Sequence, residues 1–345
     1  MHELLTGMPT AHPLVEWSLL TPEDGDALQV LLEQIEESEG VPYRTTRAEV
    51  DAMFGRSARW VGVAGYHRGD RSSEADRPML AFGYVGLARD GSREAFCQGG
   101  VASHARQAGL GMALVEWQTR VGKELLSTLP GDKPAILTHT VPAKMHDFLK
   151  GLEALGFQRR RTDAELHVSL DKWRTYDGFP PYLEIVPWTA DLDDAARRAF
   201  NATTAEIGQE AHVSIEEWAQ INEAINRDWS YLALSREGDR PRVVGLISAN
   251  SFEQDWEALG WKEGVVQMIA AFRVESRNAT LAALLDASLA AQREAQIDKV
   301  SIMIDPTEDD SLMQLYVNLG FEVSVWYHTY SIAFPVQSGS SPAEV

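Results

Sequence analysis

A short stretch rich in glycine has the residue types and spacing that bind a phosphate group. It runs from Gly99 to Leu114 as GGVASHARQAGLGMAL and contains the pattern Arg106-x-x-Gly109-x-Gly111. The pattern predicts a strand, a turn and then an amphipathic helix that starts near Gly109. Unpaired N–H groups and the helix dipole make such a helix start attractive to a pyrophosphate. Glycine at 109 and 111 leaves the main chain open to the phosphates, because no Cβ stands in the way.

A dinucleotide-binding fingerprint is the rival interpretation of this loop. That fingerprint needs G-x-G-x-x-G, whereas this chain offers R-x-x-G-x-G. A second signature follows: Leu155-Gly156-Phe157 closes a predicted helix and precedes alternating, strand-like residues. The position of the loop ahead of this second signature gives the short motif its weight.

The two signatures resemble those of the GNAT acetyltransferase superfamily. Its acetyl-CoA motif, [Q/R]-x-x-G-x-[G/A], directly follows the fourth strand, and its second hallmark is a helix ending in Leu-Gly-Phe. The resemblance implies acetyl-CoA as the acyl donor, and no metal is expected. It also implies a main-chain site of two parts: Gly99, Gly100 and Val101 for the pantetheine arm, and Arg106, Gln107, Ala108, Gly109, Leu110, Gly111 and Met112 for the pyrophosphate.

The second half of the chain repeats both signatures. The segment 106–111 stands 171 positions before 277–282, and Leu155-Gly156-Phe157 stands 164 positions before Leu319-Gly320-Phe321. Two nearly equal offsets, with the same order of predicted elements, indicate an internal duplication.

Each half keeps a different part of the machinery that the resemblance implies. The C-terminal half has Tyr316, where the family often places a tyrosine that protonates the departing thiolate, but it has Thr280 in place of the first loop glycine. A β-branched residue there should crowd a pyrophosphate. The N-terminal half has both loop glycines but Leu152 at the tyrosine position. We therefore expect the donor in the N-terminal half.

These repeats predict an α/β (α+β) fold of two tandem GNAT-type domains, each a mixed, mostly antiparallel sheet flanked by helices. The cluster Asp177-Gly178-Phe179-Pro180-Pro181 is the expected linker. The expected domains are 1–175, with an intact loop, and 182–338, with a degenerate one. The layout is similar to that of the mycothiol synthase family, in which the C-terminal half is active; its substrate is not carried over.

Capping residues and periodicity predict the elements that position the loop. Thr21-Pro22-Glu23-Asp24 has the residues of a helix start, and Thr46 to Glu49 is a capping box. Asp90-Gly91 is the expected hairpin turn. The other elements expected in the first half are strands at 60–64, 78–88, 94–103 and 134–140, helices at 109–126 and 143–155, and a strand pair within 157–170.

Acyl transfer to an amine needs a base for the amine and an acid for the thiolate. Glu94 starts the fourth strand and is the candidate base; the alternative is a solvated strand-end glutamate. His146 lies on the helix after the fifth strand and is the candidate acid; the alternative is a surface histidine. Tyr316 could serve its own half or pack in a core.

Each of the other residues near the expected site has two possible roles. Cys97 lies before the loop, near the expected thioester path, but a small buried hydrophobe is its commoner role. The first two helices flank the region where this fold usually builds its acceptor pocket. An amine-binding role or a solvated helix face would explain the acids there, which with one tyrosine are Glu33, Glu36, Glu37, Glu39 and Tyr43.

Composition limits the class of protein. A formal net charge of −20 argues against nucleic acid as a partner and can favour a cationic amine, although solubility alone would explain it. The single cysteine fits a reducing cytoplasm, and the sequence has neither a long apolar run nor a leader pattern. We expect a cytoplasmic, membrane-free monomer or homodimer that acylates a small-molecule amine. A catalytically inactive module that binds CoA or another ligand is the alternative, and a peptide or protein N-acetyltransferase is the third hypothesis.

Overall fold

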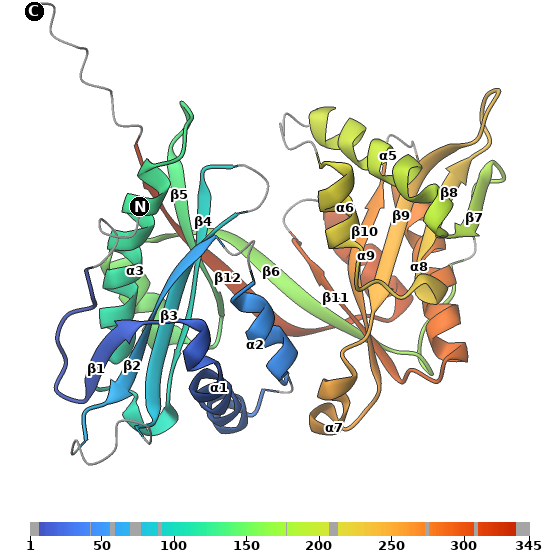
Figure 1. The fold of residues 1–345 in the computed structure, drawn as a ribbon. Coiled ribbons are helices and arrows are strands. Elements are labelled where there is room, and N and C mark those ends of the chain that lie inside the picture. The colour runs from blue at the N-terminus through green and yellow to red at the C-terminus, as the bar shows by residue number, and fades with distance from the viewer. Residues whose placement is uncertain are drawn as a thin grey trace, which may run out of the picture. The chain divides into compact units, whose positions relative to one another are not determined.

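The chain forms two compact units in the computed structural model, which describes residues 7–41, 43–55, 59–69, 77–88, 92–176, 178–206, 213–272, 276–306 and 310–335. Unit 1 comprises Met1–Arg161 with His328–Val345, and unit 2 comprises Thr162–Tyr327. In each unit, helices pack on hydrogen-bonded strands (Figure 1). The expected turn at Asp90-Gly91 and Asp177 of the expected linker lie outside the described residues.

Unit 1 is built on a mixed sheet. Its strands lie in the order β1 (Val15–Leu19), β2 (Trp60–His67), β3 (Met79–Leu87), β4 (Glu94–Val101), β5 (Ala135–Pro142) and the C-terminal part of β12 (Glu322–Phe334). Neighbours from β1 to β4 are antiparallel, whereas β4 and β5 are parallel. Its helices are α1 (Gly25–Glu39), α2 (Arg47–Met53), α3 (Leu110–Ser127) and α4 (His146–Ala154), with short 3₁₀ turns at Pro22–Asp24 and Ser103–Ala105.

Helices α1 and α3 pack on opposite faces of the unit 1 sheet. A Cβ on Gly83 would meet Leu114 of α3, and Gly83 pairs with Gly99. A Cβ on Gly100 would meet Ile35 of α1 instead. Because successive residues of a strand point to opposite faces, the residues of β4 alternate between the α3 side and the α1 side.

Local sequence signals start and end these helices as expected. The Thr46–Glu49 capping box is present at the start of α2, and the Thr21 capping box opens a 3₁₀ turn that leads into α1. Gly156 takes the left-handed conformation (φ 90°) after α4. Phe157 then donates its N–H to the carbonyl of Leu152 (3.1 Å), which satisfies one of the helix's free carbonyl groups.

Unit 2 repeats the same series. Its strands include the part of β6 (Gln158–Ser169) from Thr162 onward, then β11 (Lys299–Ile304), β10 (Glu263–Ala271), β9 (Arg242–Asn250), β8 (Tyr231–Ser235) and β7 (Leu183–Pro187) in spatial order. Its helices are α5 (Asp193–Glu206), α6 (Ile215–Ile221), α7 (Trp256–Leu259), α8 (Arg277–Glu294) and α9 (Asp310–Leu319). No helix within the described part of the chain is both long and apolar enough to cross a membrane.

The expected strand pair within 157–170 is wrong, because the segment forms the single strand β6. Strand alternation cannot distinguish one long strand from a hairpin without a turn signal. The strand passes from unit 1 into unit 2, and β12 makes the return passage. The compact units therefore differ in their bounds from the contiguous ranges 1–175 and 182–338.

The returning strand is part of the unit 1 core. Tyr330 is buried there, and its hydroxyl donates a hydrogen bond to Glu153 of α4 (2.8 Å). The hydroxyls of Thr329 and Thr140 of β5 are 3.0 Å apart. Residues far from the first half in sequence thus complete the sheet that carries the candidate loop.

Candidate functional site

The candidate loop joins β4 to α3 through a strained turn. Gly109 lies directly before the helix at φ 90°, and Gln107 has φ 61°, which is uncommon for a residue with a Cβ. Ala113 N–H donates to the carbonyl of Gly109 (3.0 Å). The preceding amides of α3, from Leu110 to Met112, therefore have no carbonyl to bond within the helix. They form the positive end of an 18-residue helix.

Gly111 leaves open space at this helix start. A Cβ built on Gly111 or on Gly109 would meet no heavy atom within 4 Å. By contrast, a Cβ on Gly122, in the same helix, would lie 2.7 Å from a methyl group of Leu137. Packing therefore explains Gly122 but not Gly111. Free amides, the helix dipole and open space together fit a pyrophosphate at the expected residues.

The expected pantetheine segment lies beyond the described pairing of β4 with β5. The parallel register runs from Glu94 opposite Ile136 to Cys97 opposite His139, so Gly99–Val101 follow its end. This part of β4 stays paired with β3. A strand edge that leaves its neighbour offers backbone N–H and C=O groups to a ligand.

Gly99 and Gly100 also have packing reasons to be glycine. A Cβ on Gly99 would lie 2.6 Å from the carbonyl oxygen of Phe82, and one on Gly100 would lie 2.6 Å from a methyl group of Ile35. The closeness of β3 and α1 thus accounts for both glycines without a ligand. Packing does not account for Gly109 or Gly111, which have no neighbour within 4 Å of a built Cβ.

Two side chains tie the loop to distant segments. Arg106 donates through Nε to the carbonyl of Val101 (3.3 Å), and its guanidinium pairs with Glu39 of α1. His12 donates through Nε2 to the carbonyl of Ala108 (2.7 Å), while its Nδ1 accepts the N–H of Leu14 (3.2 Å). The motif predicts Arg106, but no local signal could have found His12, which is 96 residues from its partner.

The α1 side of β4 carries a polar and aromatic surface that the sequence reasoning missed. Gln98 shares this side with Phe96 and Gly100 and is exposed. The Tyr84 hydroxyl donates to Gln98 Oε1 (2.5 Å), and burial raises the pKa of Tyr84 to about 12. The Tyr84 ring contacts those of Trp60 and Phe96 at 5.6 and 6.2 Å between centroids. Alternation along the strand from Glu94 was the signal that could have identified Gln98.

The two catalytic candidates of the first half occupy different elements: Glu94 shares the α1 side of β4 with Phe96 and Gln98, and His146 lies on α4. Glu94 accepts a hydrogen bond from Arg160 (3.0 Å), and it lies about 13 Å along the strand from Gln98. His146 is the exposed first residue of α4. The loop contacts given above include neither residue.

Tyr316 belongs to the core of unit 2. It is 1% exposed, its ring packs edge to face on Phe321 (5.4 Å between centroids), and burial raises its pKa. Leu152 of α4, the residue at the matching position of unit 1, is also fully buried. Both positions fill a core, and only unit 2 has a hydroxyl there.

Unit 2 replaces the loop with helix. By the sequence offset, the residues 277–280 match 106–109, yet they form the first turn of α8. Thr280 donates its N–H to Ser276 (3.0 Å) and is buried. Its methyl group is 3.0 Å from the place that a Cβ on Gly245 would take. The threonine thus packs against the sheet where unit 1 has an exposed glycine turn.

Two buried titratable residues, Cys97 and His139, are partners in the register where the β4–β5 pairing ends. Burial raises the pKa of the Cys97 thiol and lowers the pKa of His139 to about 4. The His139 ring contacts Phe148 and Phe157, and its Nε2 has no hydrogen-bond partner. A buried neutral thiol fits the expectation that Cys97 is a core residue. Among the described residues, no group of three His, Cys, Asp or Glu side chains is placed to hold a metal ion.

The acids of α1 divide into bound and exposed groups. Glu36 is buried and accepts hydrogen bonds from Thr45, and Glu39 pairs with Arg106. Glu33 is exposed and accepts from Gln29 (2.9 Å). Glu37 and Tyr43 are exposed. Of these acids, Glu36 and Glu39 are therefore the ones held by contacts to other segments of unit 1.

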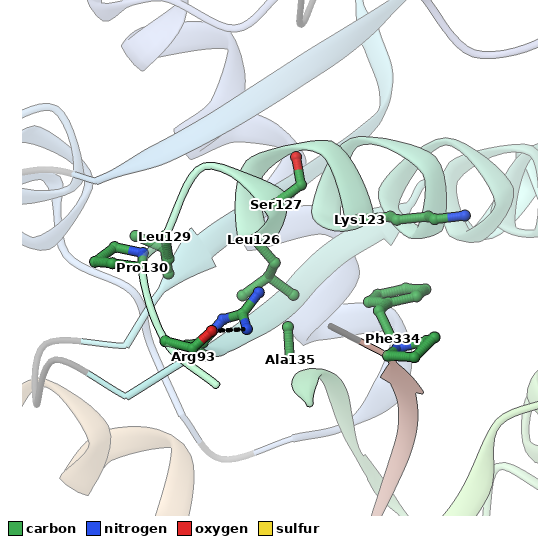
Figure 2. Close-up of a pocket in the computed structure, with 10 residues that line it drawn as sticks. Arg93, Lys123, Leu126, Ser127, Leu129, Pro130, Ala135 and Phe334 are labelled. Carbon is green, nitrogen blue, oxygen red and sulfur yellow. Dashed lines mark hydrogen bonds between the residues drawn. The ribbon is translucent and has the colours of Figure 1, made fainter. Parts of the chain in front are cut away.

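A cavity of about 600 Å³ lies at the other end of α3. Figure 2 shows Arg93, Lys123 and Phe334 around it, and Arg93 donates to the carbonyls of Gly131 (2.9 Å) and Lys133 (2.7 Å). Lys123 is 14 residues after Gly109, or roughly 20 Å along the helix axis. The cavity is therefore separate from the loop.

Comparison with known proteins finds solved structures with a similar fold. No protein-family profile matches the chain, and no curated protein sequence matches it. A GCN5-related N-acetyltransferase from Sphaerobacter thermophilus is similar with TM-score 0.72 and 18% identity, over 94% of this chain and 97% of that one. A tandem GNAT protein from the clavulanic acid biosynthesis pathway is similar with TM-score 0.64 and 15% identity, over 92% and 98% of the two chains.

A third structure has a related arrangement within a longer chain. It is a GCN5-related glucosamine N-acetyltransferase region in a fungal multi-domain β-N-acetylglucosaminidase, with TM-score 0.64 and 11% identity, over 95% of this chain and 38% of that one. The matches extend over nearly the whole chain and include a tandem protein. The fold is therefore that of GNAT N-acetyltransferases, and the predicted mixed α/β tandem architecture is confirmed.

Proposed function

We propose that this chain is an acyl-CoA-dependent N-acyltransferase. It transfers an acetyl or related short acyl group to the primary amine of a small molecule, and the donor binds to unit 1. The observation that carries the proposal is the loop before α3, where free amides of the first turn adjoin the open space at Gly111. The conversion of the matching residues of unit 2 into helix supports the choice of unit 1.

The donor would lie along main-chain groups in two places. The amides of Leu110, Gly111 and Met112 would bind the pyrophosphate, and Arg106 would hold the loop in position through Val101 and Glu39. The backbone of Gly99–Val101, beyond the described β4–β5 pairing, would bind the pantetheine arm. Cys97 contributes packing, since burial keeps its thiol protonated.

The reaction moves an acyl group directly from sulfur to nitrogen. The neutral amine attacks the thioester carbonyl and forms a C–N bond, and the C–S bond then breaks. The nitrogen gives up a proton to a base and the departing thiolate gains one, so an N-acyl amine and free CoA are released. The α1 side of β4 would receive the acceptor, with Gln98 held in place by Tyr84.

Glu94, His146 and Tyr316 stay predictions for proton transfer. The pairing of Glu94 with Arg160 occupies one of the two carboxylate oxygens that a base would use. His146 is exposed at the start of α4. The burial of Tyr316 among core side chains favours packing over proton transfer.

A binding module without catalysis is the second candidate function. Leu152 at the tyrosine position favours it, because unit 1 then lacks the hydroxyl that would protonate the thiolate. The two candidates differ in turnover: only an enzyme releases free thiol from acetyl-CoA steadily when amines are present. We further propose a cytoplasmic monomer or homodimer that needs neither metal nor nucleic acid, in keeping with one cysteine and a formal charge of −20.

Calorimetric titration of acetyl-CoA into Gly111→Leu tests the donor site. The side chain would enter the open space at the helix start, so we expect at least a tenfold loss of affinity without a fall in the melting temperature. Glu116→Leu, at an exposed site farther along α3, is the matched control and should bind as the wild type does. Equal binding by both variants would reject the donor site in unit 1, and no binding to folded wild type would reject the acyltransferase proposal.

A further inference from the structure

Two side chains of α1 hold Thr45 from either side and leave one oxygen each without a partner. Glu36 Oε1 accepts both the N–H (3.1 Å) and the hydroxyl (2.6 Å) of Thr45. Gln29 Nε2 donates to the carbonyl of Thr45 (2.8 Å). Glu36 Oε2 and Gln29 Oε1 are shielded from solvent and accept no hydrogen bond. Glu36 as a whole is only 7% exposed.

Unfilled acceptors of this kind indicate the chemistry of the missing partner. A buried oxygen without a donor is costly, and most such atoms in folded proteins have a partner. Both free atoms here are oxygens, and one belongs to a carboxyl group. The partner must therefore supply N–H or O–H donors, and an ammonium group does so while complementing the charge. The acidic chain as a whole would attract the same cation.

The Glu36 site lies close to the loop within unit 1. Ile35, its neighbour on α1, is the residue that a Cβ on Gly100 would touch. Glu39, about one helical turn farther on, pairs with Arg106, which also bonds Val101. Glu36 thus lies on α1 between Ile35, which adjoins Gly100 of β4, and Glu39, which pairs with the loop. An elongated acceptor could reach from the Glu36 carboxyl to this part of β4.

We propose that Glu36 and Gln29 bind a second ammonium group of the acceptor, so that the preferred substrates are aliphatic diamines or polyamines. This inference rests on the proposed N-acyltransferase function. One amine binds at Glu36 as the cation, and the other, neutral amine reaches the thioester at the β4 edge. The amine at Glu36 is not the nucleophile, because pairing with a carboxylate favours its charged form.

Matched kinetics with Glu36→Gln and Glu37→Gln test the inference. Both variants remove one acidic group from α1, but Glu37 is exposed. Glutamine at 36 can still accept from Thr45, while its NH₂ group would replace the free oxygen. We expect kcat/KM for 1,6-diaminohexane to fall about tenfold to a hundredfold in Glu36→Gln and to stay unchanged in Glu37→Gln. Values for hexylamine should change in neither variant.

Direct binding keeps this test separate from the proposed function. Calorimetry of 1,6-diaminohexane with the wild type and both variants needs no acetyl-CoA. Loss of binding in Glu36→Gln alone supports the site even if turnover is absent. Equal diamine and hexylamine affinity in the wild type would overturn the inference, and so would equal behaviour of both variants, since a buried water would then be the partner. Should Glu36→Gln fail to fold, the wild-type comparison of the two amines still decides.

Discussion

Burial determines the chemistry of individual side chains where β4 and β5 part. His139 of β5 is 5% exposed, and the loss of hydration lowers its pKa to about 4. Its ring contacts the rings of Phe148 and Phe157. A neutral imidazole cannot protonate a departing thiolate efficiently at neutral pH, so we treat His139 as a core residue with a consequence for stability.

His139 should make the protein less stable as the pH falls below about 6.5. The unfolded chain takes up a proton near pH 6.5, whereas the folded chain does so only near pH 4, so the unfolded state binds more protons between these values. Above pH 6.5 the contribution is fully present. We expect His139 alone to remove about 2 kcal/mol between pH 7 and pH 5.

Urea unfolding of the wild type and His139→Leu at both pH values measures this effect. The variant should lose less stability than the wild type on acidification, by about 2 kcal/mol. A matched variant at an exposed histidine, His146→Leu, should show the wild-type slope. Parallel slopes for the wild type and His139→Leu would mean that the imidazole is hydrated in the folded protein.

At the scale of elements, two glycines with different backbone conformations lie at the start of α3. Gly109 has a positive φ that side chains with a Cβ rarely adopt, and Gly111 lies in ordinary helix. Neither has a neighbour within 4 Å of a built Cβ. Substitution by alanine therefore changes backbone energy without steric clash at either position.

Gly109→Ala should destabilise the protein by about 1 kcal/mol, and Gly111→Ala should stabilise it by about 0.5 kcal/mol. A left-handed residue with a Cβ is strained, whereas alanine in a helix costs less conformational entropy than glycine. Denaturant titration of the two variants in the absence of acetyl-CoA gives both values, and each serves as the control for the other. Effects of the same sign would show that the loop has another backbone conformation.

Local elements were predictable to the extent that their signals are local. The capping box at Thr46 and the Gly156 helix end depend on neighbouring residues, and both predictions are confirmed. The hydrogen bond from His12 to the loop and the free oxygen of Glu36 depend on tertiary approach, which periodicity does not encode. The candidate loop could be found from the sequence because Gly109 and Gly111 lie at the start of the helix, so the whole signal is local.

At the scale of the whole molecule, the duplication has produced two units that exchange strands. Both halves keep the sheet order, but only unit 1 keeps a glycine turn ahead of its long helix. The sequence offsets revealed the repeat, because equal elements leave equal spacing. The exchange was not predictable, since the alternating residues of β6 and β12 suit either partner.

The exchange predicts where a core substitution near the C-terminus acts. Tyr330→Ala removes a buried ring from the core of unit 1, and Phe321→Ala removes one from unit 2, although only nine residues separate them. Each should cost about 3 kcal/mol. Hydrogen–deuterium exchange read by mass spectrometry should show faster exchange in β5 and α4 for Tyr330→Ala. For Phe321→Ala it should show faster exchange in β10 and β11. If Tyr330→Ala instead loosened β10 and β11, the last strand would belong to unit 2 in solution, as contiguous domains would require.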